Sequence, residues 1–268
     1  MTAVTDRARG AIQNEDMATL TEERTIGEIA AELPGSVRVF EKYDIDYCCG
    51  GRVSLAEACA GRGIAPGQLM QELDAAQAPD RGTAPDWQTV SLNGLVDHIL
   101  SRHHAYLKGE LPRLSGMLHK VTEAHGARHA DSLVPLGETF EALRYELESH
   151  LLKEEMVLFP IIRNLEAAAQ AGAQPAPSHC GSIANPIRVM EHEHDSAGNA
   201  LEQMRTITAN YEPPADACNT YRALFDGLKE LEADLHQHIH LENNILFPRA
   251  MALEGELASP AGGGHEHK

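Results

Sequence analysis

The last two thirds of the chain repeat the apolar spacing of long amphipathic helices. Leucine and other apolar residues return there every three or four positions with charged residues between them, as on a helix that buries one face. The periodic stretches are 91–123, 131–171, 183–211 and 214–253. They are separated by breaks at 125–129, 172–182 and 212–214. Short connections join antiparallel neighbours, so we expect an up-down-up-down four-helix bundle.

Shorter helical runs precede the bundle. They begin at residues that favour helix starts, which are Thr25, Ser36, Ser54 and Pro66. The pattern predicts a flexible leader 1–24, a small helical domain 25–77, a linker 78–88, the bundle 89–254 and a flexible tail 255–268.

Composition strengthens the all-α prediction, because aromatic residues make up only 4% of the chain and alternating β-branched runs are scarce. The formal net charge of −18 repels phosphate backbones, so nucleic acid is not an expected partner. No stretch approaches the roughly 20 apolar residues of a membrane span, and the N-terminus lacks an apolar signal core. We expect a cytoplasmic protein without membrane contact, either monomer or homodimer, whose five cysteines are reduced.

The pattern H-x3-E-x3-L-F-P occurs twice, from His150 to Pro160 and from His238 to Pro248, with the second copy 88 residues after the first. Residues four apart share one face of a helix, so each copy presents an imidazole and a carboxylate to one point. A single copy is most simply an exposed ion pair. Two copies, each following a helix that carries histidines, instead predict a buried dinuclear metal site in the bundle. Each proline is expected to bend its helix beyond the ligands.

Four imidazoles and two carboxylates suit iron or manganese, and the lack of cysteine in the motif argues against structural zinc. Glu154 and Glu242 are the predicted bridging ligands, because a carboxylate has two oxygens to share. The first and third helices must supply the other two histidines.

Those two histidines are less securely assigned by the residues alone. An ungapped repeat of 88 residues pairs His104 with His192, whereas the local sequence Glu193-His194-Asp195 favours His194. Two residues separate the alternatives, so they face different sides of the helix. The pattern does not decide between them, and it assigns no role to His103, His192 or His240.

Two adjacent cysteines, Cys48 and Cys49, precede Gly50 and Gly51. One interpretation is a helix-ending turn in which one of these glycines takes a positive φ and the thiols are partly buried. The other is a redox-active or transient iron-binding dithiol, since thiolates bind soft metals and iron-sulfur fragments. The residues alone are compatible with both interpretations.

Together these segments resemble the Repair of Iron Centres family. The bundle motifs that carry the resemblance are Arg102-His103-His104, the block from His150 to Pro160, Val189-Met190-Glu191-His192-Glu193-His194-Asp195 and the block from His238 to Pro248. The small domain adds Lys42-Tyr43-Asp44-Ile45-Asp46-Tyr47-Cys48-Cys49-Gly50-Gly51, so the resemblance covers about 25–253.

The resemblance implies a hemerythrin-like bundle with two non-haem iron ions joined by an oxo or hydroxo bridge. It carries the family's ligands onto His104, His150, Glu154, His194, His238 and Glu242. It also implies repair of iron-sulfur clusters damaged by nitrosative or oxidative stress by supplying iron. Damaged iron-sulfur proteins are then the expected partners, and nitric oxide or oxygen the expected small ligands. The alternative is a nitric oxide reductase, or a nitric oxide or oxygen sensor, at the same centre.

Overall fold

The structure, a computed structural model, describes residues 20–33, 35–76 and 86–258. Residues 1–19, 77–85 and 259–268 lie outside this description, and most of the expected leader, linker and tail falls within them. In the described ranges every regular element is a helix, and the one β-bridge is the isolated pair Thr25–Ser54. The all-α prediction is therefore confirmed.

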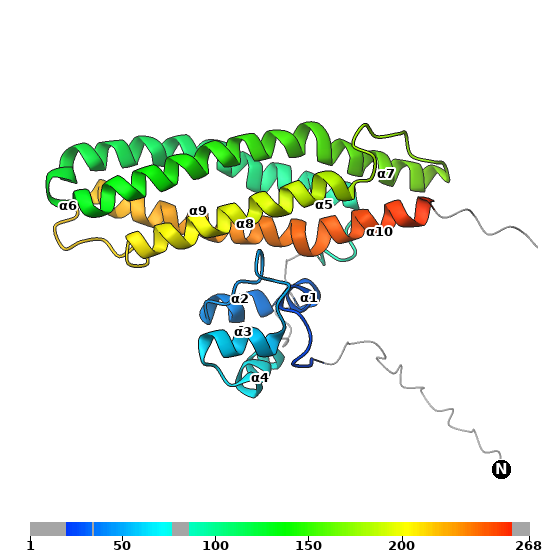
Figure 1. Cartoon of the computed structure of the whole chain (residues 1–268), viewed down its shortest axis with the longest axis horizontal. Coiled ribbons are helices and arrows are strands. Elements are labelled where there is room, and N and C mark those ends of the chain that lie inside the picture. Colours follow the sequence, from blue (N-terminus) through cyan, green and yellow to red (C-terminus); the bar gives the residue numbers. More distant parts are fainter. Residues whose placement is uncertain (1–19, 34, 77–85, 259–268) are drawn as a thin grey trace, which may run out of the picture.

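A long four-helix bundle forms most of the molecule, and a small helical unit lies against one of its sides (Figure 1). Three π-helical turns, η1 to η3, interrupt the bundle helices. In chain order the bundle contains α5 (Leu92–His98), η1 (Ile99–His104), α6 (Ala105–Lys153), η2 (Glu154–Leu158), α7 (Phe159–Ala171), α8 (Ala184–Ile207), α9 (Asn219–Leu241), η3 (Glu242–Leu246) and α10 (Phe247–Ala258). Helix α10 thus includes residues 255–258, which the sequence placed in the tail. None of the helices in the described ranges combines the length and apolar character needed to cross a membrane.

The first reversal of the bundle occurs inside α6. The backbone leaves the helical region at His129, with φ of −127° and ψ of 29°, and the two arms of α6 run antiparallel on either side of it (Figure 1). The sequence predicted a break over 125–129, and the structure concentrates the departure from helical geometry at one residue of that range.

The connection 208–218, between α8 and α9, replaces the helix start that the sequence predicted at Pro214. Residues 209–211 take positive φ values of 50°, 61° and 58°, although none of them is glycine. The Thr208 hydroxyl accepts a hydrogen bond from the Tyr211 amide at 3.0 Å and closes the turn. A left-handed turn of this kind interrupts a helix without leaving a trace in the apolar spacing.

Two apolar clusters fill the bundle and leave a polar layer between them. One cluster includes Leu107, Leu147, Leu201 and Leu235, and the other includes Ile99, Leu158, Met190 and Leu246. On each of the four helices, the residues between the two clusters include a predicted metal ligand. The bundle therefore fixes the ligand layer from both ends.

The small unit contains α1 (Ile26–Glu32), α2 (Ser36–Lys42), α3 (Leu55–Arg62) and α4 (Pro66–Ala76). Thr25 and Ser54 each begin a helix with a complete capping box, in agreement with their predicted roles. Leu20, which the sequence placed in the leader, packs against the core of this unit, and Ile239 of the bundle belongs to the same core. The shared core holds the unit on the bundle.

Candidate metal centre

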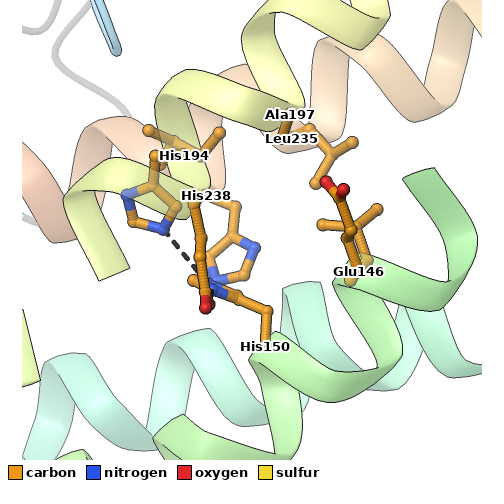
Figure 2. Close-up of a pocket in the computed structure, with 9 residues that line it drawn as sticks. Glu146, His150, His194, Ala197, Leu235 and His238 are labelled. Carbon is orange, nitrogen blue, oxygen red and sulfur yellow. Dashed lines mark hydrogen bonds and ion pairs between the residues drawn. The ribbon is translucent and has the colours of Figure 1, made fainter. Parts of the chain in front are cut away.

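Four histidines and two glutamates meet in the polar layer of the bundle. Each side chain is buried, with at most 3% of the residue exposed. Three of these residues end or begin an element: His104 ends η1, Glu154 begins η2 and Glu242 begins η3. His238 lies one turn before Glu242 on α9. Figure 2 shows the rings of His150, His194 and His238 pointing toward one another from three helices.

The ligand atoms form two overlapping groups. One group contains His104, Glu154, His238 and Glu242, and the other contains His150, Glu154, His194 and Glu242, with the ligand atoms of each group within 4.8 Å of one another. Both glutamates belong to both groups. This sharing is the arrangement that two bridging carboxylates require.

Each glutamate lies between histidines of two different helices. Glu154 Oε2 lies 3.3 Å from His104 Nε2 and 3.4 Å from His150 Nε2. Glu242 Oε2 lies 3.2 Å from His194 Nε2, while its Oε1 lies 3.1 Å from His238 Nε2. All four helices of the bundle thus contribute to one layer, as the register of the sequence predicted.

The carboxylate oxygens of this layer face imidazole nitrogens without forming hydrogen bonds to them. Both oxygens of Glu154 and both of Glu242 are buried and make no hydrogen bond to any described residue. A buried carboxylate without a hydrogen-bond partner is strongly destabilising unless a cation or proton compensates it. The residues therefore fit a cation pair, which would occupy these oxygens and the facing imidazole nitrogens.

Two of the histidines are oriented by a second carboxylate. His104 Nδ1 lies 2.8 Å from Glu155 Oε1, and His150 Nδ1 lies 2.9 Å from Glu193 Oε2. Each of these carboxylates also pairs with a lysine. A carboxylate that accepts from Nδ1 leaves Nε2 directed at the metal and raises the basicity of the ring.

The other two histidines have different surroundings. His194 Nδ1 lies 2.8 Å from the amide oxygen of Asn243, which is neutral. His238 Nδ1 is buried and finds no hydrogen-bond partner among the described residues. Its ring instead stacks on His103, with centroids 5.3 Å apart and planes 5° apart. His103 Nδ1 lies 3.1 Å from Asp234 Oδ1. His103 therefore packs between Asp234 and the His238 ring.

The histidines that the sequence left unassigned are now placed. His192 is exposed and His194 is buried with its ring in the layer, so the ungapped pairing of His104 with His192 is wrong. His240 is buried beside the small unit, where its Nδ1 lies 2.9 Å from Asn244 Nδ2.

Comparison with known proteins agrees with this geometry. A model of the hemerythrin HHE cation binding domain matches residues 95–250, and a model of the ScdA_N domain, described as a domain of unknown function, matches residues 22–77. A probable iron-sulfur cluster repair protein of Haemophilus influenzae is 37% identical over 85% of this chain and 97% of its own length. The iron-sulfur cluster repair proteins YtfE of an Enterobacter species and of Escherichia coli O157:H7 are each 39% identical over 87% of this chain and 98% of their own lengths.

The chain belongs to the hemerythrin-like family of iron-sulfur cluster repair proteins. The hemerythrin match contains all six of the converging residues, and the ScdA_N match contains both adjacent cysteines. The two parts of the family signature therefore correspond to the bundle and to the small unit.

Proton equilibria differ between the two motif copies of this family member. Burial lowers the pKa of His150, but the Glu154 and Glu242 carboxylates raise it further, to about 9. Burial keeps the pKa of His238 below its ordinary value in spite of the same carboxylates. Burial raises the pKa of Glu242, yet the His238 and His194 imidazoles hold it well below its usual range. A metal ion bound here would therefore displace a proton from His150.

The adjacent cysteines form a loop held together by Asp46. Its carboxylate accepts backbone hydrogen bonds from Cys48, Cys49 and Gly50 at 2.8–3.0 Å. The hydrogen bond to Cys49 and burial raise the pKa of the Cys48 thiol well above its ordinary value. The two sulfurs lie 3.7 Å apart. Protonated and buried, this thiol is a poor nucleophile while the loop stays in place.

The predicted positive φ at Gly50 or Gly51 is wrong, because both glycines have ordinary backbone angles. Close packing explains Gly51 instead. A Cβ on Gly51 would lie 2.9 Å from the Tyr47 carbonyl oxygen and 3.1 Å from Gly27 Cα. The loop is thus pressed against helix α1, and a larger residue has no room there.

Several features of the centre had weak signals in the sequence. The outer partners Glu155, Glu193 and Asn243 are each one residue from a ligand, which was the available clue. The π-helical turns were missed as well. Phe159 and Phe247 donate to the carbonyls of Glu154 and Glu242, five residues back, just before each proline. Such π turns occur often at functional sites.

Proposed function

We propose that the six converging residues hold two iron ions, with Glu154 and Glu242 as bridging ligands. The observation that carries this proposal is the membership of both glutamates in both ligand groups. One ion would take the two histidines of the first group, and the other ion those of the second. Imidazole and carboxylate are donors that non-haem iron accepts readily. When bound, the iron would supply redox chemistry and open positions for nitric oxide or oxygen.

We further propose that the protein repairs iron-sulfur clusters damaged by nitrosative or oxidative stress, and that it does so in the cytoplasm by supplying iron. The names of the relatives support repair over the alternative, a nitric oxide reductase or gas sensor. Damaged iron-sulfur proteins would be the partners and iron the cargo.

The small cavity beside the centre supports the supply of iron to a partner protein rather than direct contact between the centre and a damaged iron-sulfur cluster. The cavity adjoining His150, His194 and His238 has a volume of about 10 Å³, close to the room that one water needs. A damaged cluster is too large to enter it. Iron must therefore leave the layer before it reaches a partner protein.

The test compares two variants that differ by two positions on one helix. His194→Ala removes a buried ligand, and His192→Ala removes an exposed histidine of the same helix. Iron content is measured by metal analysis, and repair is measured as activity regained by an iron-depleted or nitrosylated cluster enzyme. We expect His192→Ala to match the parent protein and His194→Ala to lose iron and repair together. Repair that persists in His194→Ala without bound iron would refute iron supply from this site.

A further inference from the structure

The loop of adjacent cysteines touches the bundle at a ligand helix. The Cys49 thiol donates to the backbone carbonyl of His194, with sulfur and oxygen 3.3 Å apart. Gly198, one turn further along α8, provides the room, since a Cβ there would lie 3.2 Å from Cys49 Sγ. The small unit thus reaches the helix segment that presents one of the four histidines.

Asn243 joins this loop to the ring of the same histidine. Its Oδ1 lies 2.8 Å from His194 Nδ1, and its Nδ2 donates to the carbonyl oxygen of Cys48 at 3.3 Å. A primary amide has both a donor and an acceptor, so one side chain serves both contacts. A carboxylate at this position would accept from the histidine but would offer nothing to the Cys48 carbonyl.

The outer partners of the other ligands remain within the bundle. Glu155 and Glu193, which orient His104 and His150, pair with lysines of the bundle helices. Within the described chain, His194 is thus the one ligand whose outer partner bonds to the small unit. A neutral amide also raises the basicity of a ligand histidine less than a carboxylate does.

A second contact holds the loop without touching a ligand ring. Asn244 Nδ2 donates to the carbonyl oxygen of Tyr47 at 2.8 Å. Neighbouring residues on η3 therefore make different contacts. Asn243 links the loop to the His194 ring, whereas Asn244 links the loop to η3 without a side-chain hydrogen bond to any of the six converging residues.

A cleft between the small unit and the bundle opens beside these contacts. Its volume is about 380 Å³, and its lining includes both cysteines, Asn243, Glu191 and Asp195. Carboxylates and thiols are donors through which a cation leaving the layer would be bound in passing. The cleft becomes wider if the loop moves away from α8.

We propose that Asn243 is a positioning residue that makes retention of the iron on the His150–His194 side depend on docking of the loop 47–51. Loosening of this loop weakens the Asn243 contact, lowers the hold of His194 on its metal and opens the cleft. The iron on the His104–His238 side stays longer. This inference deepens the proposed function, on which it rests, because it assigns which ion is delivered and what controls its delivery.

The experiment follows removal of iron by a coloured ferrous chelator from anaerobically loaded full-length protein. Two release phases of equal amplitude are expected. Asn243→Leu keeps the size of the side chain and removes both hydrogen bonds, so it should speed one phase about 10- to 100-fold. Glu155→Gln is the matched variant on the other side, because Glu155 stands in the same relation to His104, and it should speed the other phase.

Asn244→Ala separates docking from direct contact with the ligand. It should raise amide exchange over residues 47–51 of the metal-free protein and speed the same phase as Asn243→Leu. Faster exchange with both release phases unchanged would overturn the inference, as would equal release rates in Asn243→Leu and the parent protein. Failure to load two irons in the parent protein would instead refute the proposed di-iron site, so the two failures are distinguishable.

Discussion

The two copies of the H-x3-E-x3-L-F-P motif have the same backbone conformation but are covered by different parts of the molecule. Each copy passes from a helix through a π turn into a helix that starts at phenylalanine. The residue after the motif glutamate contacts the histidine of the preceding helix in both copies: Glu155 contacts His104, and Asn243 contacts His194. The first contact is backed by a lysine at the surface, and the second is covered by the small unit. A symmetric ligand layer thus has asymmetric support.

The neighbouring groups explain why one copy has glutamate and the other asparagine after the motif glutamate. Lys108 can reach Glu155 because that side of the bundle faces solvent, where 55% of the lysine side chain is exposed. Asn243 instead donates to the Cys48 carbonyl, to which a carboxylate could not donate. A duplicated motif can thus keep its histidine and glutamate while its outer contacts adapt to a neighbouring domain.

Removal of either motif glutamate should have the greatest effect on metal content. It tests whether each glutamate contributes to both of the proposed metal positions. Glu154→Ala and Glu242→Ala should each lose both irons, because every ligand group contains both glutamates. Metal analysis and iron absorption measure the loss, and circular dichroism checks that the variants remain helical. A variant that retains one full equivalent of iron would show that its glutamate serves a single ion.

The pH dependence of the metal-free protein should distinguish the histidines of the two copies. The pKa of His150 rises from 6.5 to about 9 on folding, so its stabilisation is complete below about pH 6.5 and disappears as pH rises through 9. The shift corresponds to roughly 3 kcal/mol as an upper figure. Glu242 has a lowered pKa, so its stabilisation is present above about pH 4.5 and is lost in acid.

The metal-free protein should therefore be most stable between about pH 4.5 and 6.5. Urea unfolding across pH measures this profile. His150→Gln should flatten the alkaline side, whereas His238→Gln should not, because the pKa of His238 is lowered. Equal flattening by both variants would contradict the assigned difference between the copies.

A substitution in the small unit tests how tightly the loop beside the second copy is packed. Gly51→Ala places a methyl group 2.9 Å from the Tyr47 carbonyl oxygen, and such overpacking costs about 1–3 kcal/mol. Gly61→Ala is the control, because nothing lies within 4 Å of the added Cβ and the position is helical. Thermal unfolding should show Gly51→Ala destabilised and Gly61→Ala unchanged or stabilised. Comparable destabilisation of both would argue against close packing at Gly51.

The smallest effect is expected at the solvent-facing copy. Lys108→Ala removes the lysine that pairs with Glu155, but a half-exposed ion pair contributes only about 0–1 kcal/mol. Two irons should still bind, and their affinity, measured by competition with a chelator, should change less than in Glu155→Gln. A loss of iron equal to that of Glu155→Gln would mean that the lysine, rather than the carboxylate, orients His104.

The sequence predicted those parts of the molecule that depend on local spacing. The helical period predicted the bundle, and the i, i+4 pairs of His150 with Glu154 and of His238 with Glu242 predicted three of the four members of each ligand group. Capping at Thr25 and Ser54 was likewise a local property and was predicted correctly.

Features that depend on the folded arrangement could not be predicted from local spacing. The choice of His194 over His192 depends on the rotation of α8 in the bundle, and the role of Asn243 depends on a loop 195 residues away. The left-handed turn at 209–211 follows from its own hydrogen bonds rather than from any apolar pattern. In each case the deciding interaction joins groups whose proximity exists only after folding.

The polar layer also sets how the bundle unfolds. It separates two apolar clusters and contains buried carboxylates that face imidazoles without forming hydrogen bonds to them. Such a layer transmits little cooperativity, so the halves of the metal-free bundle should melt as two calorimetric units. Metal ligands from all four helices would fuse them into one. Under the proposed supply of iron, each release of metal would therefore leave the bundle less rigid than before.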